Sequence, residues 1–324
     1  MKFVMTQAVC DEGMLLLDGV ADVYVADNRD PNNYLDQMQD ADAIIVRIAK
    51  MDANAIANSP NLKVIGRTGV GYDTVDVAEA TRRGIPVVIT PGANNLSVAE
   101  HSVALMFALS KNLVESHNEQ MQGNYAIRGK GVAFELKTKS VLVLGLGSIG
   151  RLVAKICEAI GMRVIGYDPF LSKEEIESFC TEACIDYHDA LPRADFVTVH
   201  VPLIDSTRSM IGEKEIATMK PSAMVINCAR GGVIDEKALA DALNEGRLAG
   251  AGIDCFEEDP PKIDNPLMNA KNVIVTPHSA AQTKEAVVNM AMMCVNGCLA
   301  ICRGEKWPYV ADKNVYNHPR WKDK

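Results

Sequence analysis

The chain has 324 residues, 48% of them apolar and 23% charged, enough for one large hydrophobic core or two domain-sized cores. A formal charge of -9, with no run of Lys and Arg, argues against a nucleic-acid surface. Asp11 and Glu12 interrupt any apolar run at the N-terminus and no later segment is expected to reach membrane-spanning length, so we expect a cytoplasmic protein.

Short β-branched runs alternate with amphipathic segments in the first part of the chain. The expected strands read KFVM, DVYVA, AIIVR, KVIGR and PVVIT and cover residues 2–5, 22–26, 43–47, 63–67 and 86–90. Such alternation of strands with helical segments predicts a parallel α/β architecture. A long run at 97–121, SVAEHSVALMFALSKNLVESHNEQM, follows and is predicted to be helical.

The same alternation restarts after this helical run. The expected strands of the second part lie within residues 140–147, 163–168, 195–202, 223–229, 250–254 and 272–278. Two α/β units therefore share the chain, and the first gives way to the second around Leu96. The helical stretch expected after about Ala286 is predicted to return to the first unit.

Nine cysteines are scattered through the chain and are expected to be reduced thiols, since no export signal is evident. Cys294, Cys298 and Cys302 recur every four positions, which would place them on one face of a helix. That spacing suits either a metal or cluster site or a buried apolar stripe. Because Val, Met, Leu and Ile share the stripe, the core interpretation is favoured and no metal is expected.

A glycine-rich turn directly after the expected strand at 140–144 is the first chemical signal. Its glycines allow a tight turn and close approach of the backbone to a pyrophosphate, and the following helix N-terminus offers free N–H groups. The next strand ends in Asp168, whose carboxylate is placed to bind ribose hydroxyls and to repel a 2′-phosphate. Pro169 and Phe170 follow it, where an NADP site would favour an Arg. NAD is therefore the expected cofactor, with contacts at Gly145, Gly147, Ser148, Ile149 and Gly150.

Three later segments each place polar residues at the C-terminal end of an expected strand, where parallel sheets bind ligands. They contain Arg230, the acids at 257–259, and His278. Hydride transfer to a carbonyl needs a cation that holds the substrate carboxylate and a group that protonates the developing alkoxide. Histidine suits the second task because its ordinary pKa, about 6.5, is close to working pH. Each residue has a structural interpretation when taken singly, but together with a nucleotide fold they predict an active site.

Seven segments, in this order, resemble the D-isomer-specific 2-hydroxyacid dehydrogenase family: GVGYDTVD, SVAEHSVALMFAL, GLGSIG, HVPLIDST, INCARGGVIDEKAL, DCFEEDPP and TPHSA. The resemblance spans residues 42–283. It implies two parallel-sheet domains, Rossmann-like or flavodoxin-like, with an active-site cleft between them. Residues 1–96 plus 287–324 would form the substrate-binding domain and residues 97–286 the NAD-binding Rossmann domain. A homodimer joined in part by the helix that begins near Ser97 is also implied, although an intrachain contact would equally explain that helix's apolar face.

The resemblance assigns roles to individual residues. Arg230 is implied to orient the substrate and His278 to act as the acid/base. Asp254 resembles the aspartate near the nicotinamide carboxamide, beside the backbone of Cys228, which is not expected to be a nucleophile. The other implied cofactor contacts are His200, Val201, Pro202 and Thr207, with a structural role for His200 equally open. The implied substrate contacts are Val70, Gly71 and Asn94, and also Arg47, which would bind a second anionic group or be an ordinary surface arginine.

The acidic partner of the histidine departs from the family pattern. The family's glutamate stands five residues after the aspartate that closes the preceding strand, and counting from Asp254 gives Asp259, one methylene shorter. Asp259 stands at the family's position in the sequence, whereas Glu258 has only its longer side chain in its favour. We therefore favour Asp259 as the partner of His278 and keep Glu258 as the alternative, with Glu257 as a solvated turn residue.

The function implied by the resemblance is NAD-dependent interconversion of a 2-oxo acid and a D-2-hydroxy acid. Two alternatives stay open: an NAD-sensing scaffold like the C-terminal-binding corepressors, and a phosphite dehydrogenase-like enzyme on the same fold. A small-molecule substrate is expected, with no nucleic-acid or membrane partner. No regulatory domain like that of longer phosphoglycerate dehydrogenases is expected after Lys324, and phosphoglycerate stays open as a substrate.

Overall fold

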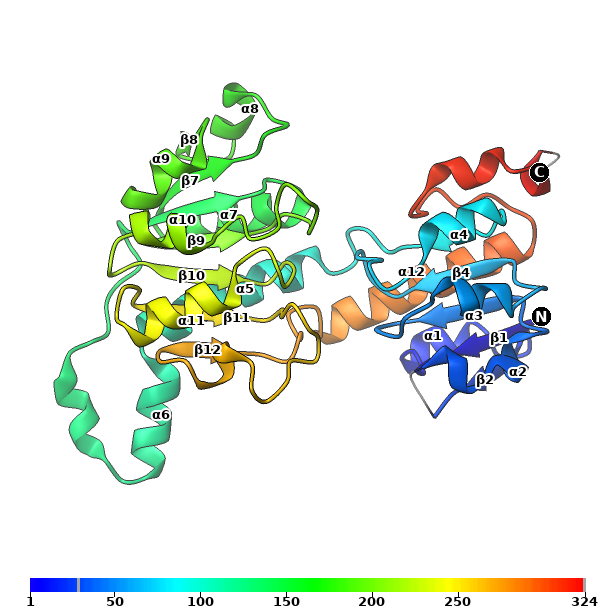
Figure 1. The fold of residues 1–324 in the computed structure, drawn as a ribbon, viewed down its shortest axis with the longest axis horizontal. Coiled ribbons are helices and arrows are strands. Elements are labelled where there is room, and N and C mark those ends of the chain that lie inside the picture. Colours follow the sequence, from blue (N-terminus) through cyan, green and yellow to red (C-terminus); the bar gives the residue numbers. More distant parts are fainter. Residues whose placement is uncertain (28–29, 323–324) are drawn as a thin grey trace. The chain divides into compact units, whose positions relative to one another are not determined.

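The computed structural model describes residues 1–27 and 30–322. The chain forms two compact units, one made of Met1–Asn94 and Gln282–Lys324 and the other of Asn95–Ala281 (Figure 1). The first boundary between the units lies at 94/95, two residues before the expected boundary at 96/97. The second lies at 281/282, five residues before the expected boundary at 286/287. The helices explain the difference, because α5 begins at Asn95 within the second unit and α12 begins at Lys284 within the first.

The first unit is built on a five-stranded parallel sheet in the order β2-β1-β3-β4-β5. Its strands are β1 Lys2–Met5, β2 Asp22–Val25, β3 Ala43–Val46, β4 Val64–Arg67 and β5 Val87–Val88, and its helices are α1 Asp11–Leu15, α2 Leu35–Met38, α3 Ala53–Ala57, α4 Val77–Arg82 and α12 Lys284–Cys302. Every residue of β3 is buried, as expected for a parallel strand with cores on both faces of the sheet. This flavodoxin-like strand order has its switch point between β1 and β3.

Helix α12 forms one side of this unit's core. Cys294 and Cys298 are fully buried against β4, where a Cβ on Gly66 would lie 2.7 Å or less from either sulfur. The cysteine stripe therefore lies in the core, with Cys302 partly buried at its end. The expectation that no segment reaches membrane-spanning length is wrong for α12, which has 19 residues and contains an 18-residue window with a mean hydropathy of 1.6. More than half of this stretch is buried inside the unit, which accounts for its apolar composition.

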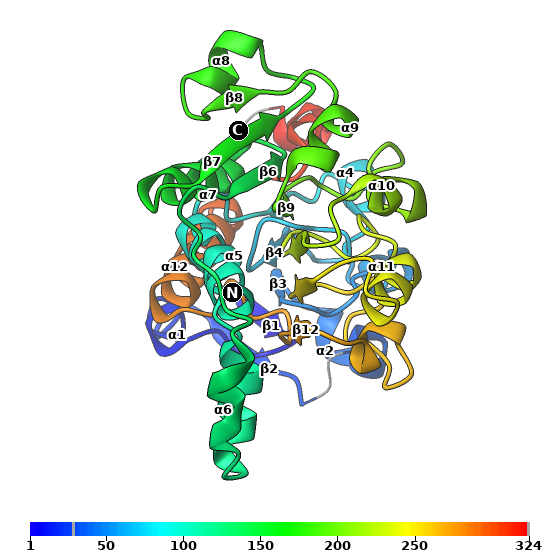
Figure 2. The ribbon, with the colours of Figure 1, turned by 90° about the vertical axis from the view of Figure 1, so that its left-hand side faces the viewer.

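The second unit is built on a seven-stranded parallel sheet in the order β12-β11-β10-β9-β6-β7-β8. Its strands are β6 Ser140–Leu144, β7 Arg163–Tyr167, β8 Glu182–Ala183, β9 Phe196–Val199, β10 Met224–Asn227, β11 Gly250–Ile253 and β12 Val273–Val275, and its helices are α5 Asn95–Ser110, α6 Leu113–Met121, α7 Ser148–Ala159, α8 Lys173–Glu177, α9 Tyr187–Ala190, α10 Glu213–Thr218 and α11 Glu236–Asn244. Only the short β8 has no counterpart among the expected strands. Helices α5 and α7 cover one face of this sheet and α10 and α11 the other (Figure 2). The order reverses between β6 and β9, so their loops form the switch point where doubly wound sheets bind nucleotides.

The helical run predicted over 97–121 is two helices rather than one. Asn112, between α5 and α6, has a φ of 51°, a left-handed conformation that asparagine tolerates better than most residues. Its side chain donates a hydrogen bond to Glu115 Oε2 at 2.7 Å, in the first turn of α6. As a result α6 leaves the sheet and projects from the unit with none of its residues buried (Figure 1).

Candidate active site

The parallel sheet of the second unit brings most of the expected site residues to one edge. Because all its strands run in the same direction, the residues that follow them gather at the C-terminal edge. These residues are the glycine turn after β6, Asp168 after β7, His200 after β9, Arg230 after β10, Asp254 after β11 and His278 after β12. The sequence expectation that these strand ends form one site is thus consistent with the topology.

The glycine turn after β6 fits a dinucleotide. A Cβ on Gly150 would lie 1.9 Å from the carbonyl oxygen of Gly145, so only glycine lets α7 start this close to the strand. Above Gly147 the space is open, with no atom within 4 Å of where a Cβ would be, and the N-terminus of the twelve-residue α7 follows directly at Ser148 and Ile149. Asp168 accepts a hydrogen bond from the Leu146 N–H at 2.9 Å, which places its carboxylate beside the turn.

His200 lies across the switch point from this turn. Its N–H donates to the Leu144 carbonyl at 2.7 Å, and its ring is 2.9 Å from the hydroxyl of the buried Thr198. Burial lowers the pKa of His200 to about 4. The ring is therefore neutral at physiological pH and suits either an uncharged wall of the adenine site or a structural role. In the loop that continues through Val201 and Pro202, the Thr207 hydroxyl donates to the Pro202 carbonyl at 2.6 Å.

Asp259, and not Glu258, contacts His278. The carboxylate Oδ2 of Asp259 is hydrogen-bonded to Nδ1 of the His278 ring, and both side chains are partly exposed. Glu258 instead forms an exposed ion pair with Lys262 at 2.9 Å. Glu257 lies 3.6 Å from Arg208 in another exposed pair. The shorter aspartate therefore reaches the histidine from the register that the sequence favoured.

The segment that carries Arg230 packs against the segment that carries the acids. A Cβ on Gly231 would lie 1.9 Å from the backbone carbonyl of Phe256, so the two segments touch through their main chains. The Asn227 side chain braces the same turn, because its amide donates to the Arg230 carbonyl at 2.9 Å and its oxygen accepts from the Ala229 N–H at 3.0 Å. This backbone contact fixes the Arg230 and Asp259 segments side by side.

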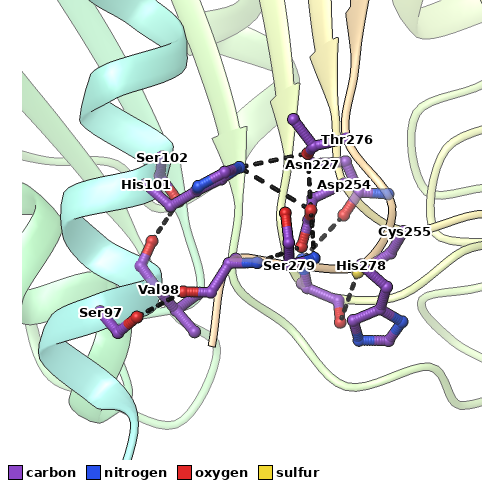
Figure 3. Close-up of polar contacts among 12 residues, drawn as sticks. Ser97, Val98, His101, Ser102, Asn227, Asp254, Cys255, Thr276, His278 and Ser279 are labelled. Atoms are coloured by element: carbon purple, nitrogen blue, oxygen red, sulfur yellow. Dashed lines mark hydrogen bonds and ion pairs between the residues drawn. The ribbon is translucent and has the colours of Figure 1, made fainter. Parts of the chain in front are cut away.

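Asp254 is fully buried and holds the turn that carries His278 (Figure 3). Its carboxylate accepts hydrogen bonds from the Thr276 hydroxyl at 2.6 Å, the Ser279 N–H at 2.8 Å and the Ala280 N–H at 2.9 Å. These donors lie on either side of His278, whose ring points away from the carboxylate.

The sequence interpretation did not foresee this turn-anchoring network, which also includes His101 and Ser97 of α5. Thr276 and Ser279 lie within three residues of His278 in the segment TPHSA. Ser97 and His101 lie one helical turn apart, on the same face of α5. A serine and a histidine at that spacing, in a helix with a long apolar face, are the signal that would have pointed to them.

The thiol of Cys228, the residue that directly follows β10, is buried. Burial raises the pKa of the Cys228 thiol to about 12, so it stays protonated and is not a nucleophile. Within residues 1–27 and 30–322, no group of three or more His, Cys, Asp or Glu side chains is arranged to hold a metal ion.

The four remaining expected residues lie in the first unit, at the C-terminal edge of its sheet. Arg47 directly follows β3, and its guanidinium is hydrogen-bonded to the side chain of Gln282. Val70 and Gly71 lie in the turn after β4, and Asn94 lies in the loop after β5. The buried Oδ1 of Asn94 has no hydrogen-bond partner among the described residues, and neither have the hydroxyls of Thr68 and Thr90 on the same edge. Unpaired polar atoms of this kind are expected where a polar ligand binds.

The glycine turn at the switch point of a doubly wound sheet places the second unit among dinucleotide-binding domains. Residues 103–280 match the family described as D-isomer specific 2-hydroxyacid dehydrogenase, NAD binding domain, and the chain belongs to this family, which confirms the resemblance.

Among its relatives, the chain is 42% identical to the D-3-phosphoglycerate dehydrogenase of Methanocaldococcus jannaschii over 320 residues, which are 98% of this chain and 60% of that protein. It is 37% identical to the glyoxylate reductase of Thermococcus litoralis over 288 residues, 87% of this chain and 86% of that protein. The crystal structure of D-lactate dehydrogenase with NAD+ from Lactobacillus jensenii is 28% identical, with a TM-score of 0.77 over 97% of this chain and 100% of that one. The chain spans 50–60% of the length of the D-3-phosphoglycerate dehydrogenases to which it is similar.

The lowered pKa of His200 predicts a contribution to acid sensitivity. The unfolded chain binds a proton at this residue near pH 6.5 whereas the folded chain does so only near pH 4, so stability is complete above pH 6.5 and falls as the pH drops toward 4. His200→Gln keeps a polar partner for Thr198 but cannot titrate. Between pH 7.5 and 5 the unsubstituted protein should lose about 1–2 kcal/mol more unfolding free energy than this variant, measured by urea denaturation. His117→Gln, at an exposed position on α6, should lose as much as the unsubstituted protein. Equal losses in all three would contradict the assignment.

Proposed function

We propose that this protein is an NAD-dependent oxidoreductase that interconverts a 2-oxo acid and a D-2-hydroxy acid. The observation that carries the proposal is the hydrogen bond between Asp259 and His278, at the same sheet edge as the dinucleotide turn and Arg230. Family membership supports it, and the relatives named above are dehydrogenases and reductases. The glycine turn and Asp168 would hold NADH, which would supply the hydride for the carbonyl carbon.

His278 would move the proton, and the contact with Asp259 determines which nitrogen does so. Because Nδ1 faces the Asp259 carboxylate, Nε2 is the nitrogen left to face the substrate. In reduction, the protonated ring donates the Nε2 proton to the carbonyl oxygen as the hydride arrives. In oxidation, neutral Nε2 takes the hydroxyl proton back. The Asp259 carboxylate orients the ring and stabilises its charged form.

Cationic and polar groups of each unit would bind the substrate's anionic groups. The Arg230 guanidinium suits the carboxylate of a 2-oxo acid, because it donates two parallel hydrogen bonds, and it would polarise the adjacent carbonyl. In the first unit, the resemblance to the family implies that the turn at Val70 and Gly71 offers backbone N–H donors to the substrate. The unpaired side-chain oxygens of Thr68, Thr90 and Asn94 support a polar ligand at this edge.

We further propose a substrate with a second anionic group, such as the phosphate of 3-phosphoglycerate. The greater identity to the D-3-phosphoglycerate dehydrogenase than to the glyoxylate reductase supports this choice. Arg47 offers the cation, because it follows β3 at the C-terminal edge, beside the switch point of the first sheet. Its contact with Gln282 is to a neutral side chain, so its charge is available to a phosphate.

The proposed reaction predicts NADH consumption with 2-oxo acids. In a panel of glyoxylate, pyruvate, hydroxypyruvate and 3-phosphohydroxypyruvate, the phosphorylated acid should have the highest kcat/KM. NADH should be preferred over NADPH by at least about tenfold, or about 1.4 kcal/mol, because Asp168 repels the 2′-phosphate. His278→Ala should lower kcat by about 10²–10⁴ while NADH still binds.

The controls separate this function from its alternatives. Arg47→Ala should raise KM for 3-phosphohydroxypyruvate and leave that for glyoxylate unchanged. NADH binding without turnover of any 2-oxo acid would instead favour a sensing scaffold, and oxidation of phosphite would favour the other enzyme. Near-normal turnover by His278→Ala would show that the proton comes from a different residue.

The two neighbouring acids should differ sharply when each is neutralised. Asp259→Asn should lower kcat about 10- to 100-fold, because the amide neither orients the ring as the carboxylate does nor stabilises its charge. Glu258→Gln should keep kcat within about twofold, since its carboxylate pairs with Lys262 in solvent. Steady-state kinetics of both variants with the best 2-oxo acid decides this. A loss confined to Glu258→Gln would transfer the role to that residue.

We also propose that the protein forms a homodimer. Its cytoplasmic location stays a prediction. The projecting helix α6 has no buried residue and exposes Leu113, Val114 and Met121. Exposed apolar residues gathered in this way are typical of a protein interface. Sedimentation should give twice the mass of the chain, and Leu113→Asp with Met121→Asp should give the single mass. Ile185→Asp, at an even more exposed residue near β8, should leave the dimer intact. A monomer without any substitution would contradict the proposal.

A further inference from the structure

Helix α5 touches the His278-bearing turn at two points. The hydroxyl of Ser97 donates to the Ala280 carbonyl at 2.6 Å, in a buried contact. One helical turn further along, Nε2 of His101 lies 3.1 Å from the hydroxyl oxygen of Thr276. Thr276 and Ala280 bracket His278, so α5 holds both ends of the segment that carries the proposed acid/base.

The hydrogen-bond donors in this network can be assigned from chemistry. The Thr276 hydroxyl lies 2.6 Å from Asp254 Oδ1, and an ionised carboxylate only accepts. The single hydroxyl proton therefore goes to Asp254, and the hydroxyl oxygen must accept from the His101 ring. It follows that Nε2 of His101 carries a proton and fixes the rotation of the hydroxyl. That nitrogen also lies 3.7 Å from Asp254 Oδ1, close enough to support the buried charge.

The burial of Asp254 makes each donor matter. A fully enclosed carboxylate is strongly destabilising unless it is hydrogen-bonded, so its donors are held firmly in place. The turn supplies all three of the donors described above, two backbone N–H groups and one hydroxyl. Only the hydroxyl can rotate away, and His101 is the group that prevents it. The His278 N–H in turn donates to the Thr276 carbonyl at 2.9 Å, which links this anchor to the histidine backbone.

We infer that His101 is a positioning residue for His278, acting through Thr276 and Asp254. The expected effect of His101 on catalysis rests on the proposed function. Asp254 then anchors the turn through its own hydrogen bonds, whether or not it also contacts the nicotinamide carboxamide. His101 fixes the backbone that aims the His278 ring, without contacting the substrate. This matters for catalysis because a displacement of about 1 Å at a reacting group can cost 10²-fold in rate.

The kinetic test uses two single variants and their combination. His101→Leu and Thr276→Val should each lower kcat for 2-oxo acid reduction about tenfold, with both KM values within about twofold. The double variant should be no slower than either single one, because both remove the same link. His101→Gln, which restores an N–H donor of similar reach, should recover most of the rate. Thr218→Val, whose exposed hydroxyl bonds only within α10, is the matched control and should be unchanged. Unchanged kcat in His101→Leu, or losses that multiply in the double variant, would overturn the inference.

A second readout does not depend on turnover. Protein labelled with 15N at its six histidines should show a hydrogen-bonded Nε2–H for His101, assigned by its loss in His101→Gln. In Thr276→Val this signal should shift, and so should the ring signals of His278. If no 2-oxo acid is turned over, the proposed function fails, but these shifts still decide the positioning role. Unshifted His278 signals in both Thr276→Val and His101→Leu would overturn it.

Discussion

A carboxylate sealed from solvent is the constraint on which the candidate site depends. Asp254 has no exposed surface, and a charge in that position persists only if several donors surround it. The donors come from the turn that carries His278, so the hydrogen bonds that compensate the buried charge also fix the turn. A loop at a sheet edge would otherwise be the most mobile part of the structure. Here it is held by hydrogen bonds that cannot be exchanged for water.

Parallel strand direction supplies the second constraint. Each strand of the second unit ends at the same edge, which gathers residues that lie more than a hundred positions apart in the sequence, from Gly145 to His278. Close main-chain contacts refine that arrangement, since Gly150 and Gly231 occupy places where a Cβ would overlap backbone atoms. The sheet determines which segments meet at the site, and these glycines determine how closely the backbones of those segments approach one another.

Much of this could be predicted from the sequence, because strands in a parallel sheet are continuous apolar runs and residues after them share an edge. The two-unit division and the dinucleotide turn follow from such local patterns, whereas the register that favours Asp259 came from the resemblance to the family. The break at Asn112 did not, because it depends on one residue adopting a left-handed conformation within an otherwise helical pattern. Nor did the contact of His101 with Thr276, which joins residues 175 positions apart through side-chain packing. The spacing of Ser97 and His101 marks one face of α5, but it does not identify the turn that this face contacts.

The two carboxylates near His278 differ in environment, and this difference separates their tasks. Asp259 is partly exposed and its carboxylate contacts Nδ1 of the ring, so it acts on the ring directly. Asp254 is enclosed and accepts hydrogen bonds from Thr276, Ser279 and Ala280, so it acts on the turn that carries the ring. If both carboxylates contacted the ring, moving the turn would change its charge balance along with its position. With one carboxylate holding the turn and the other beside the ring, the fold sets the position of the ring and its nearest charge through separate residues.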